Sequence, residues 1–219
     1  MNNMIVLVGP ICAGKGESVK FLEGKGYKPF IFSDSLKKAF HSTTFERDFP
    51  NTEYPVSRGT IYETVTTARL ISPTVDVFAR VVVDEINNLQ ERERLQFVFD
   101  GLRHPEEVTY VKEHLGAMVI GLTAADEVRE SRYKTRQKEM DTAGKDTFRE
   151  VDLRDRGIGQ PAYGTRVDDC MELADIIVTN NGTLADLHFG LDNALLHLGL
   201  EGQSRQTEGQ PWFDRFRRL

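Results

Sequence analysis

Nine residues near the N-terminus have the types and spacing that bind phosphate. They run from Gly9 to Glu17 and contain a Gly-x4-Gly-Lys string that ends with Gly14 and Lys15. Glycines let the backbone wrap closely around phosphate oxygens, so that consecutive N–H groups point at the anion. The Lys15 ammonium can reach the terminal phosphates of a nucleotide. A Gly-rich surface turn is the alternative, but such a turn needs no lysine at this position.

The flanking residues predict the strand and the helix that such a loop requires. Met4 to Val8 are uninterrupted apolar residues, as in a buried parallel strand. Residues 17–23 have helical character and stop at Gly24 and Gly26. The N-terminus of that helix adds about half a positive charge beside the phosphates. The predicted nucleotide-phosphate site comprises Gly9, Ala13, Gly14, Lys15, Gly16, Glu17 and Ser18.

The residue after Lys15 departs from the commonest form of this loop. A Ser or Thr there usually supplies a hydroxyl to Mg2+, whereas this chain has Gly16 and then Glu17. Other residues, water or the substrate phosphates must then hold the Mg2+. The Gly-Lys-Gly form resembles the adenylate-kinase branch of phosphate-binding-loop (P-loop) kinases, where Thr usually follows. The Gly-Lys-Gly-Glu version resembles a dephospho-CoA-kinase-like group of small nucleotide kinases.

Two further apolar runs are followed by an acid. Residues 95–100 predict a strand that ends in Asp100, and residues 30–33 predict a strand that precedes Asp34. Ligands of open parallel sheets bind beyond the carboxyl ends of the strands. Asp100 is therefore the expected carboxylate that orders Mg2+ and its waters. Asp34 could orient the acceptor, act as general base or hold Mg2+ through water, and an N-cap role can coexist with these.

The stretch that begins at Asp100 strengthens the resemblance. It reads Asp-Gly-Leu-Arg-His-Pro-Glu-Glu-Val over residues 100–108. This resembles the Asp-Gly-Ile-Arg-x-Pro-x-Glu-Val stretch of the dephospho-CoA-kinase-like group, and also the kinase-like domain attached to some deoxycytidylate deaminases. The resemblance implies that Arg103 lies near the phosphates. His104 is expected to be a surface or capping residue rather than a catalyst.

Residues 34–75 are expected to bind the acceptor. Residues 41–59 are polar, contain two prolines and a glycine, and predict a loop over the active face. Arg58 and Arg69 flank a helix predicted over residues 60–70. In the kinases that the chain resembles, this region grips the acceptor. The two arginines are therefore candidates for binding an acceptor phosphate, and plain surface arginines are the alternative.

A basic segment lies in the second half of the chain. Residues 129–166 hold ten Lys/Arg and seven acids, a balance of +3, while the remainder carries −9. On a helix, Arg129, Arg132 and Arg136 share one face. The matching segment of nucleotide kinases is the lid, which closes over ATP and supplies arginines to the transferring phosphate. We therefore assign catalytic roles to Arg132 and Arg136 and expect a lid over residues 126–165; a solvated, ion-paired helix face is the alternative.

The last predicted strand, residues 176–179, leads through an Asn-Asn-Gly-Thr-Leu turn into a final helix. This arrangement resembles the adenine-contacting end of dephospho-CoA kinases, which implies that Asn180 and Gly182 lie beside the base. A plain Asn-Gly turn fits equally well. The final helix is expected to bury Leu184, Leu187, Leu191, Leu195 and Leu198.

Residues 1–200 are expected to form the kinase domain, followed by a linker and tail over residues 201–219. Residues 201–210 are rich in Gly, Gln and Ser, which is typical of a flexible linker. The last nine residues contain three aromatics and three arginines. The segment fits three interpretations: docking on a neighbouring subunit in a homodimer, docking on another partner, or a plain tail.

The composition limits the class of protein. The chain has 219 residues, of which 39% are hydrophobic and 28% charged, as in an ordinary soluble domain. No apolar run approaches the roughly 20 residues that span a bilayer, and the first predicted strand begins too early for a signal peptide. Cys12 and Cys170 lack metal-ligand spacing and indicate a reducing compartment, so we expect a cytoplasmic protein without a membrane partner. The net charge of −6 argues against nucleic acid as the main partner.

These patterns predict an α/β fold with a doubly wound, five-stranded parallel sheet: a P-loop NTPase of the nucleotide-kinase type, with strand order 2-3-1-4-5 and a lid insertion. The resemblance implies an ATP- and Mg2+-dependent phosphotransferase that acts on a nucleotide-like small molecule: a nucleoside or deoxynucleoside monophosphate, or a dephospho-CoA-like acceptor. A nucleotide sensor without transfer is the rival, supported by Glu17 and the unexplained tail. A kinase of modified nucleosides, even within DNA, ranks lower because the chain is acidic.

Overall fold

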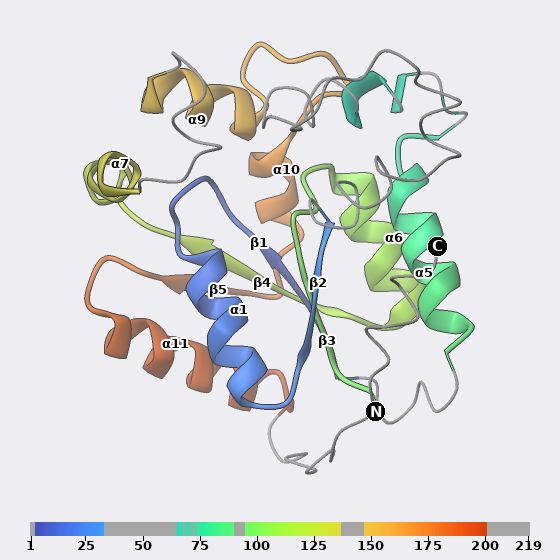
Figure 1. Ribbon diagram of the computed structural model, residues 1–219, viewed down its shortest axis with the longest axis horizontal. Helices are drawn as coiled ribbons and strands as arrows, with labels where there is room; N and C mark the ends of the chain where they lie inside the picture. The colour runs from blue at the N-terminus through green and yellow to red at the C-terminus, as the bar shows by residue number, and fades with distance from the viewer. Residues whose placement is uncertain are drawn as a thin grey trace.

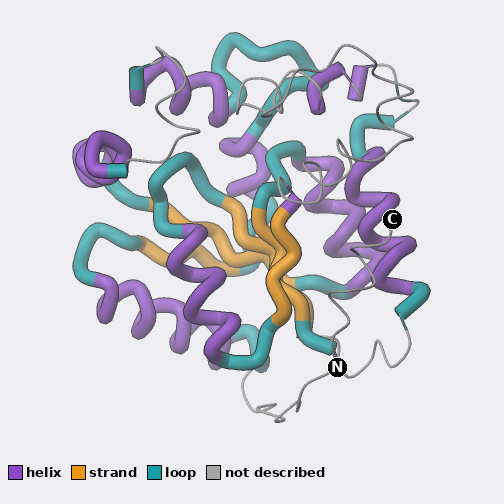
Figure 2. Tube along the Cα trace, in the orientation of Figure 1, coloured by secondary structure: helices purple, strands orange, loops and turns teal. Residues whose placement is uncertain are grey.

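The computed structural model describes residues 3–32, 65–67, 69–70, 72, 74–89, 95–136 and 147–200. Within these residues a five-stranded sheet is covered by helices on both faces (Figures 1 and 2). The strands are β1 (Met4–Val8), β2 (Lys28–Ile31), β3 (Phe97–Asp100), β4 (Met118–Thr123) and β5 (Ile176–Thr179). All neighbouring strands are parallel, and their order is β2-β3-β1-β4-β5. The predicted fold class and strand order are therefore confirmed.

The central strand β1 is buried along its whole length, because all five of its residues are apolar. Its register pairs Leu7 with Asp100 of β3, and Ile31 of β2 also pairs with Asp100. The carboxylate at the end of β3 therefore lies at the carboxyl end of the sheet, where the Gly-rich loop leaves β1.

Two helical layers bury the two faces of the sheet. One face packs against α1 (Lys15–Gly24) and α11 (Leu184–His197). The other packs against α5 (Val77–Asn87), α6 (Pro105–Leu115) and α10 (Val167–Glu172). The remaining helices, α7 (Asp126–Thr135) and α9 (Phe148–Arg156), stand beyond the carboxyl ends of the strands (Figure 1).

Several expected boundaries shift. The second strand lies over Lys28–Ile31 rather than residues 30–33, and the first helix begins at Lys15 rather than at residue 17. Leu184 was expected in the core but is 51% exposed, because it is the first residue of α11 after the Thr183 N-cap. No helix in the described ranges is long and apolar enough to cross a membrane.

Candidate nucleotide-binding site

The Gly-rich loop between β1 and α1 has a backbone that requires glycine at both ends. Gly9 and Gly14 have φ values of 151° and 115°. A Cβ atom on Gly9 would lie 2.4 Å from the Leu122 carbonyl oxygen of β4. Between them, Cys12 has a φ of 58°, which is uncommon for a residue with a side chain. The loop backbone therefore packs directly against β4 at the carboxyl end of the sheet.

Lys15 begins α1 and folds back over the loop. Its Nζ atom donates to the Pro10 carbonyl oxygen at 3.1 Å and also to that of Gly9. The ammonium group therefore lies beside the loop backbone, where a phosphate bound to the loop N–H groups would be in reach.

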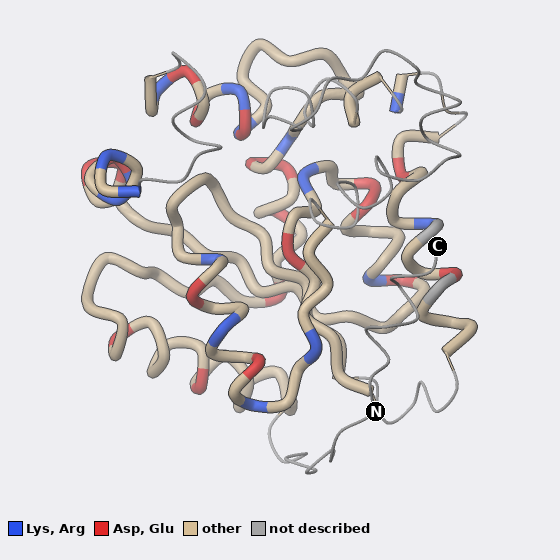
Figure 3. Tube along the Cα trace, in the orientation of Figure 1, with Lys and Arg blue, Asp and Glu red and all other residues tan. Residues whose placement is uncertain are grey.

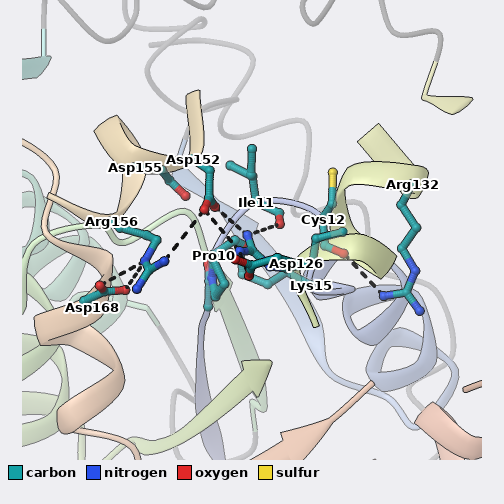
Figure 4. Close-up of polar contacts among 12 residues, drawn as sticks. Pro10, Ile11, Cys12, Lys15, Asp126, Arg132, Asp152, Asp155, Arg156 and Asp168 are labelled. Atoms are coloured by element: carbon teal, nitrogen blue, oxygen red, sulfur yellow. Dashed lines mark hydrogen bonds and ion pairs between the residues drawn. The ribbon is translucent and has the colours of Figure 1, made fainter. Parts of the chain in front are cut away.

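Two arginines of the predicted lid contact the Gly-rich loop at Cys12. Arg132 donates from Nη1 to the Cys12 carbonyl oxygen at 3.4 Å (Figure 4). Its Nη2 atom donates to the Asn180 carbonyl oxygen at 3.0 Å. At the end of α7, the Nη1 atom of Arg136 lies 3.9 Å from the Cys12 sulfur. The structure therefore brings both predicted arginines to the same point of the loop.

Arg129, on the same helix, is a buried structural residue. Its side chain is 2% exposed and donates to the Ile11 carbonyl oxygen at 3.2 Å. The same guanidinium binds the carboxylates of Asp126 and of Asp152 on α9. Burial alone would lower the pKa of Arg129, but the hydrogen bonds to the two carboxylates outweigh it and raise that pKa. Arg129 thus ties α9 to the back of the loop.

A second carboxylate of α9 holds the arginine that follows β3. Arg103 forms an ion pair with Asp155, whose side chain is 7% exposed. The negative charge of Asp155 is the largest cause of the raised pKa of Arg103. Because Asp152 and Asp155 are one turn apart, α9 binds arginines from two separate elements. Figure 3 shows the interleaved acidic and basic residues of this helix.

His104, next to Arg103, is buried rather than on the surface as expected. It is 1% exposed, and its Nε2 atom lies 2.7 Å from the Ala162 carbonyl oxygen. It does occupy the N-cap position of α6, without a side-chain capping bond. The histidine therefore fastens the chain after α9 to the start of α6.

The candidate acceptor residues are only partly within the described chain. Asp34 and Arg58 lie outside the described residues. Arg69 is 3% exposed, and its Nε and Nη2 atoms bind the Glu107 carboxylate of α6 at 3.1 and 2.7 Å. Its Nη1 atom is buried and finds no hydrogen-bond partner within the described part of the chain. The acceptor role of Arg69 stays a prediction.

The end of β3 offers a single carboxylate to a metal ion. The Oδ1 atom of Asp100 is buried and has no hydrogen-bond partner among the residues that the structure describes. In the described ranges, no group of three or more His, Cys, Asp and Glu side chains could hold a metal. Gly16 has open space where a side chain would be, and the Ser18 hydroxyl donates to the Gly14 carbonyl oxygen at 3.1 Å. A single carboxylate from Asp100 fits Mg2+, because this ion commonly takes one or two carboxylates and completes its coordination with phosphate oxygens and water.

A pocket of about 310 Å3 opens between α1 and α11. Its lining comprises Gly14, Glu17, Arg132, Asn180, Leu184 and Leu187. The side chain of Asn180 fixes the loop, since its Nδ2 atom donates to the Ala13 carbonyl oxygen at 2.9 Å. Gly182 lies just before the Thr183–Asp186 capping box of α11. The predicted base-contacting turn therefore borders a pocket that begins at the Gly-rich loop.

Sequence reasoning missed the two aspartates of α9. They were counted as charges within a basic segment, although their three-residue spacing places both carboxylates on one side of a helix. That spacing, combined with the predicted arginines nearby, is the signal that could have identified them.

Two solved structures share the fold of this chain. A shikimate kinase from Bacteroides thetaiotaomicron superposes with a TM-score of 0.54 at 11% identity, covering 90% of this chain and 98% of that one. The protein TT1252 from Thermus thermophilus gives 0.54 at 19% identity, with coverage of 90% and 98%. Together with the strand order, these likenesses show that the chain shares the fold of this shikimate kinase and of TT1252.

Among sequence relatives, a UPF0200 protein of the archaeon Methanopyrus kandleri is 27% identical over 180 residues, which are 81% of this chain and 80% of that one. No protein-family model matches the chain. The name of this relative states no activity. The narrower group predicted from the motifs, dephospho-CoA-kinase-like or nucleoside monophosphate kinases, therefore stays a prediction.

Proposed function

We propose that the protein is an ATP-dependent phosphotransferase whose acceptor is a nucleotide-like small molecule: a nucleoside or deoxynucleoside monophosphate, or a dephospho-CoA-like compound. The observation that carries this proposal is the convergence of Lys15, Arg132 and Arg136 on one loop. Cations at this position neutralise the charge that spreads over the transferring phosphoryl group. In a sensor that only binds nucleotide, the same cations would serve binding alone, which the variants in the Discussion distinguish from catalysis.

The proposed reaction uses residues from several parts of the chain. The loop N–H groups and the N-terminus of α1 bind the β- and γ-phosphates. Lys15 exchanges its carbonyl partners for phosphate oxygens, while Arg132 and Arg136 approach from α7. Asp100 would hold Mg2+, which when bound neutralises charge on the β- and γ-oxygens. Asp34 is proposed to orient or deprotonate the acceptor, and Arg103 to bind its phosphate.

The test is a screen of ATP turnover with candidate acceptors. Nucleoside and deoxynucleoside monophosphates, dephospho-CoA, and hydroxylated nucleosides, both free and within DNA, are each added to protein, ATP and Mg2+. ADP formation that one acceptor class stimulates supports the proposal and identifies the substrate. ATP binding with no stimulated turnover across the panel would instead favour the sensor.

A further inference from the structure

The pocket beside the loop joins two chemically different walls. Gly14 and Glu17 form one wall from the start of α1, and Leu184 and Leu187 form the other from α11. A nucleoside triphosphate with its phosphates on the loop and its base against the leucines would have its sugar beside Glu17. This placement rests on the proposed function, because it takes the ligand to be a nucleoside triphosphate.

Two of the polar side chains in this pocket are already engaged within the protein. Arg132 donates to the Asn180 carbonyl and side-chain oxygens at 3.0 and 3.3 Å, and Asn180 donates to the Ala13 carbonyl oxygen. Glu17 differs, because it is 48% exposed and its carboxylate pairs with Lys20, which is 70% exposed, at 2.8 Å. Exposed pairs of this kind contribute little free energy and exchange readily for other partners. The Glu17 carboxylate is therefore the acceptor that a ligand can recruit.

The charge of Glu17 determines which part of a nucleotide suits it. A carboxylate repels phosphate oxygens, which are themselves anionic. It accepts strong, charge-assisted hydrogen bonds from hydroxyl groups. Acidic side chains bind ribose hydroxyls in this way in dinucleotide-binding folds. The sugar is the part of the ligand that carries such donors, and it lies beside Glu17 in the placement above.

We propose that the Glu17 carboxylate accepts a hydrogen bond from a ribose hydroxyl of the donor nucleotide. It thereby selects ribonucleoside triphosphates over donors that lack these hydroxyls. This assigns a purpose to the residue that replaces the usual Thr in the loop.

The proposal is tested by calorimetric binding of ATP and 2′,3′-dideoxy-ATP with Mg2+ and without any acceptor. The parent protein should bind ATP about 10- to 100-fold more tightly, as expected for a hydrogen bond to a charged group. In Glu17→Ala the two affinities should become equal, through weaker binding of ATP. The 2′-deoxy and 3′-deoxy forms then identify which hydroxyl is bound.

Two matched variants control for charge and for the ion pair. Glu23→Ala removes an exposed carboxylate from the same helix, and Lys20→Met removes the partner of Glu17. Both should keep the parent ratio of affinities. Equal binding of the two ligands by the parent, or an equal change for both in Glu17→Ala, would overturn the role of Glu17 alone. Failure of the parent to bind any nucleotide would overturn the proposed function itself.

Discussion

The side-chain amide of Asn180 lies against Gly14, where a Cβ atom on Gly14 would be only 2.3 Å from Asn180 Nδ2. The same amide donates to the carbonyl oxygen of Ala13. The turn after β5 thus holds the phosphate loop in place through Asn180. This contact requires that residue 14 has no side chain.

Gly14→Ala should therefore disrupt the loop in two ways. The added methyl group displaces Asn180, and the φ of 115° becomes strained. We expect a loss of stability of about 1–3 kcal/mol and a fall in ATP affinity of at least about tenfold. Urea denaturation and calorimetry measure the two effects. Gly24→Ala is the control, because within the described residues the added Cβ would meet nothing closer than 4 Å outside its own helix backbone and chain neighbours. Equal behaviour of the two variants would show that Gly14 is not a close contact.

The sheet and the loop could be predicted because their signals are local. The strand β1 is a continuous apolar run, and the Gly-x4-Gly-Lys string from Gly9 to Lys15 by itself indicates a phosphate-binding loop. The role of Arg129 could not be predicted in this way. Its helical spacing groups it with Arg132, and only the packing of α9 against α7 decides that Arg129 becomes buried while Arg132 reaches the loop. Such long-range packing also explains the buried His104, whose partner lies 58 residues away.

Lys15→Ala should abolish phosphoryl transfer and leave the fold intact. Its Nζ atom donates to the carbonyl oxygens of Gly9 and Pro10, and these two bonds join the loop to itself rather than to another element. Steady-state ADP formation and thermal unfolding measure the two properties. Lys20→Ala, on the exposed side of α1, should retain activity. Comparable turnover by Lys15→Ala and the parent would contradict the assignment of the loop.

Asp100→Asn should lower the rate by orders of magnitude at saturating Mg2+, because the carboxylate proposed to hold the metal loses its charge. ATP binding measured without metal should change little. In the reverse direction, Gly16→Ser places a hydroxyl in open space, and it should lower the Mg2+ concentration that gives half-maximal turnover. If Asp100→Asn turned over like the parent, another acid would have to hold the metal, with Asp34 the next candidate.

Asp155→Asn should destabilise the protein strongly, because it leaves the Arg103 charge without its buried partner. Arg103 is 27% exposed, so the loss should lie below the cost of breaking a fully buried ion pair, which is about 3–5 kcal/mol. The matched control is Asp168→Asn, whose partner is Arg156; these two side chains are 44% and 34% exposed. An exposed pair contributes about 0–1 kcal/mol. Denaturant unfolding of both variants gives the comparison, and a similar loss in each would mean that α9 is not held by Asp155.

Arg132→Ala and Arg136→Ala should separate catalysis from binding. If the two guanidinium groups stabilise the transferring phosphoryl group, their removal lowers kcat far more than it weakens ATP binding, by about 10^3 or more for a residue acting like an arginine finger. Lys134→Ala is the control on α7, since Lys134 is 69% exposed and pairs with Glu130. Single-turnover rates and calorimetric affinities are measured for all three variants. A sensor would show the opposite pattern, with weakened ATP binding and no acceptor-stimulated turnover to lose, because its arginines would serve only to hold the nucleotide.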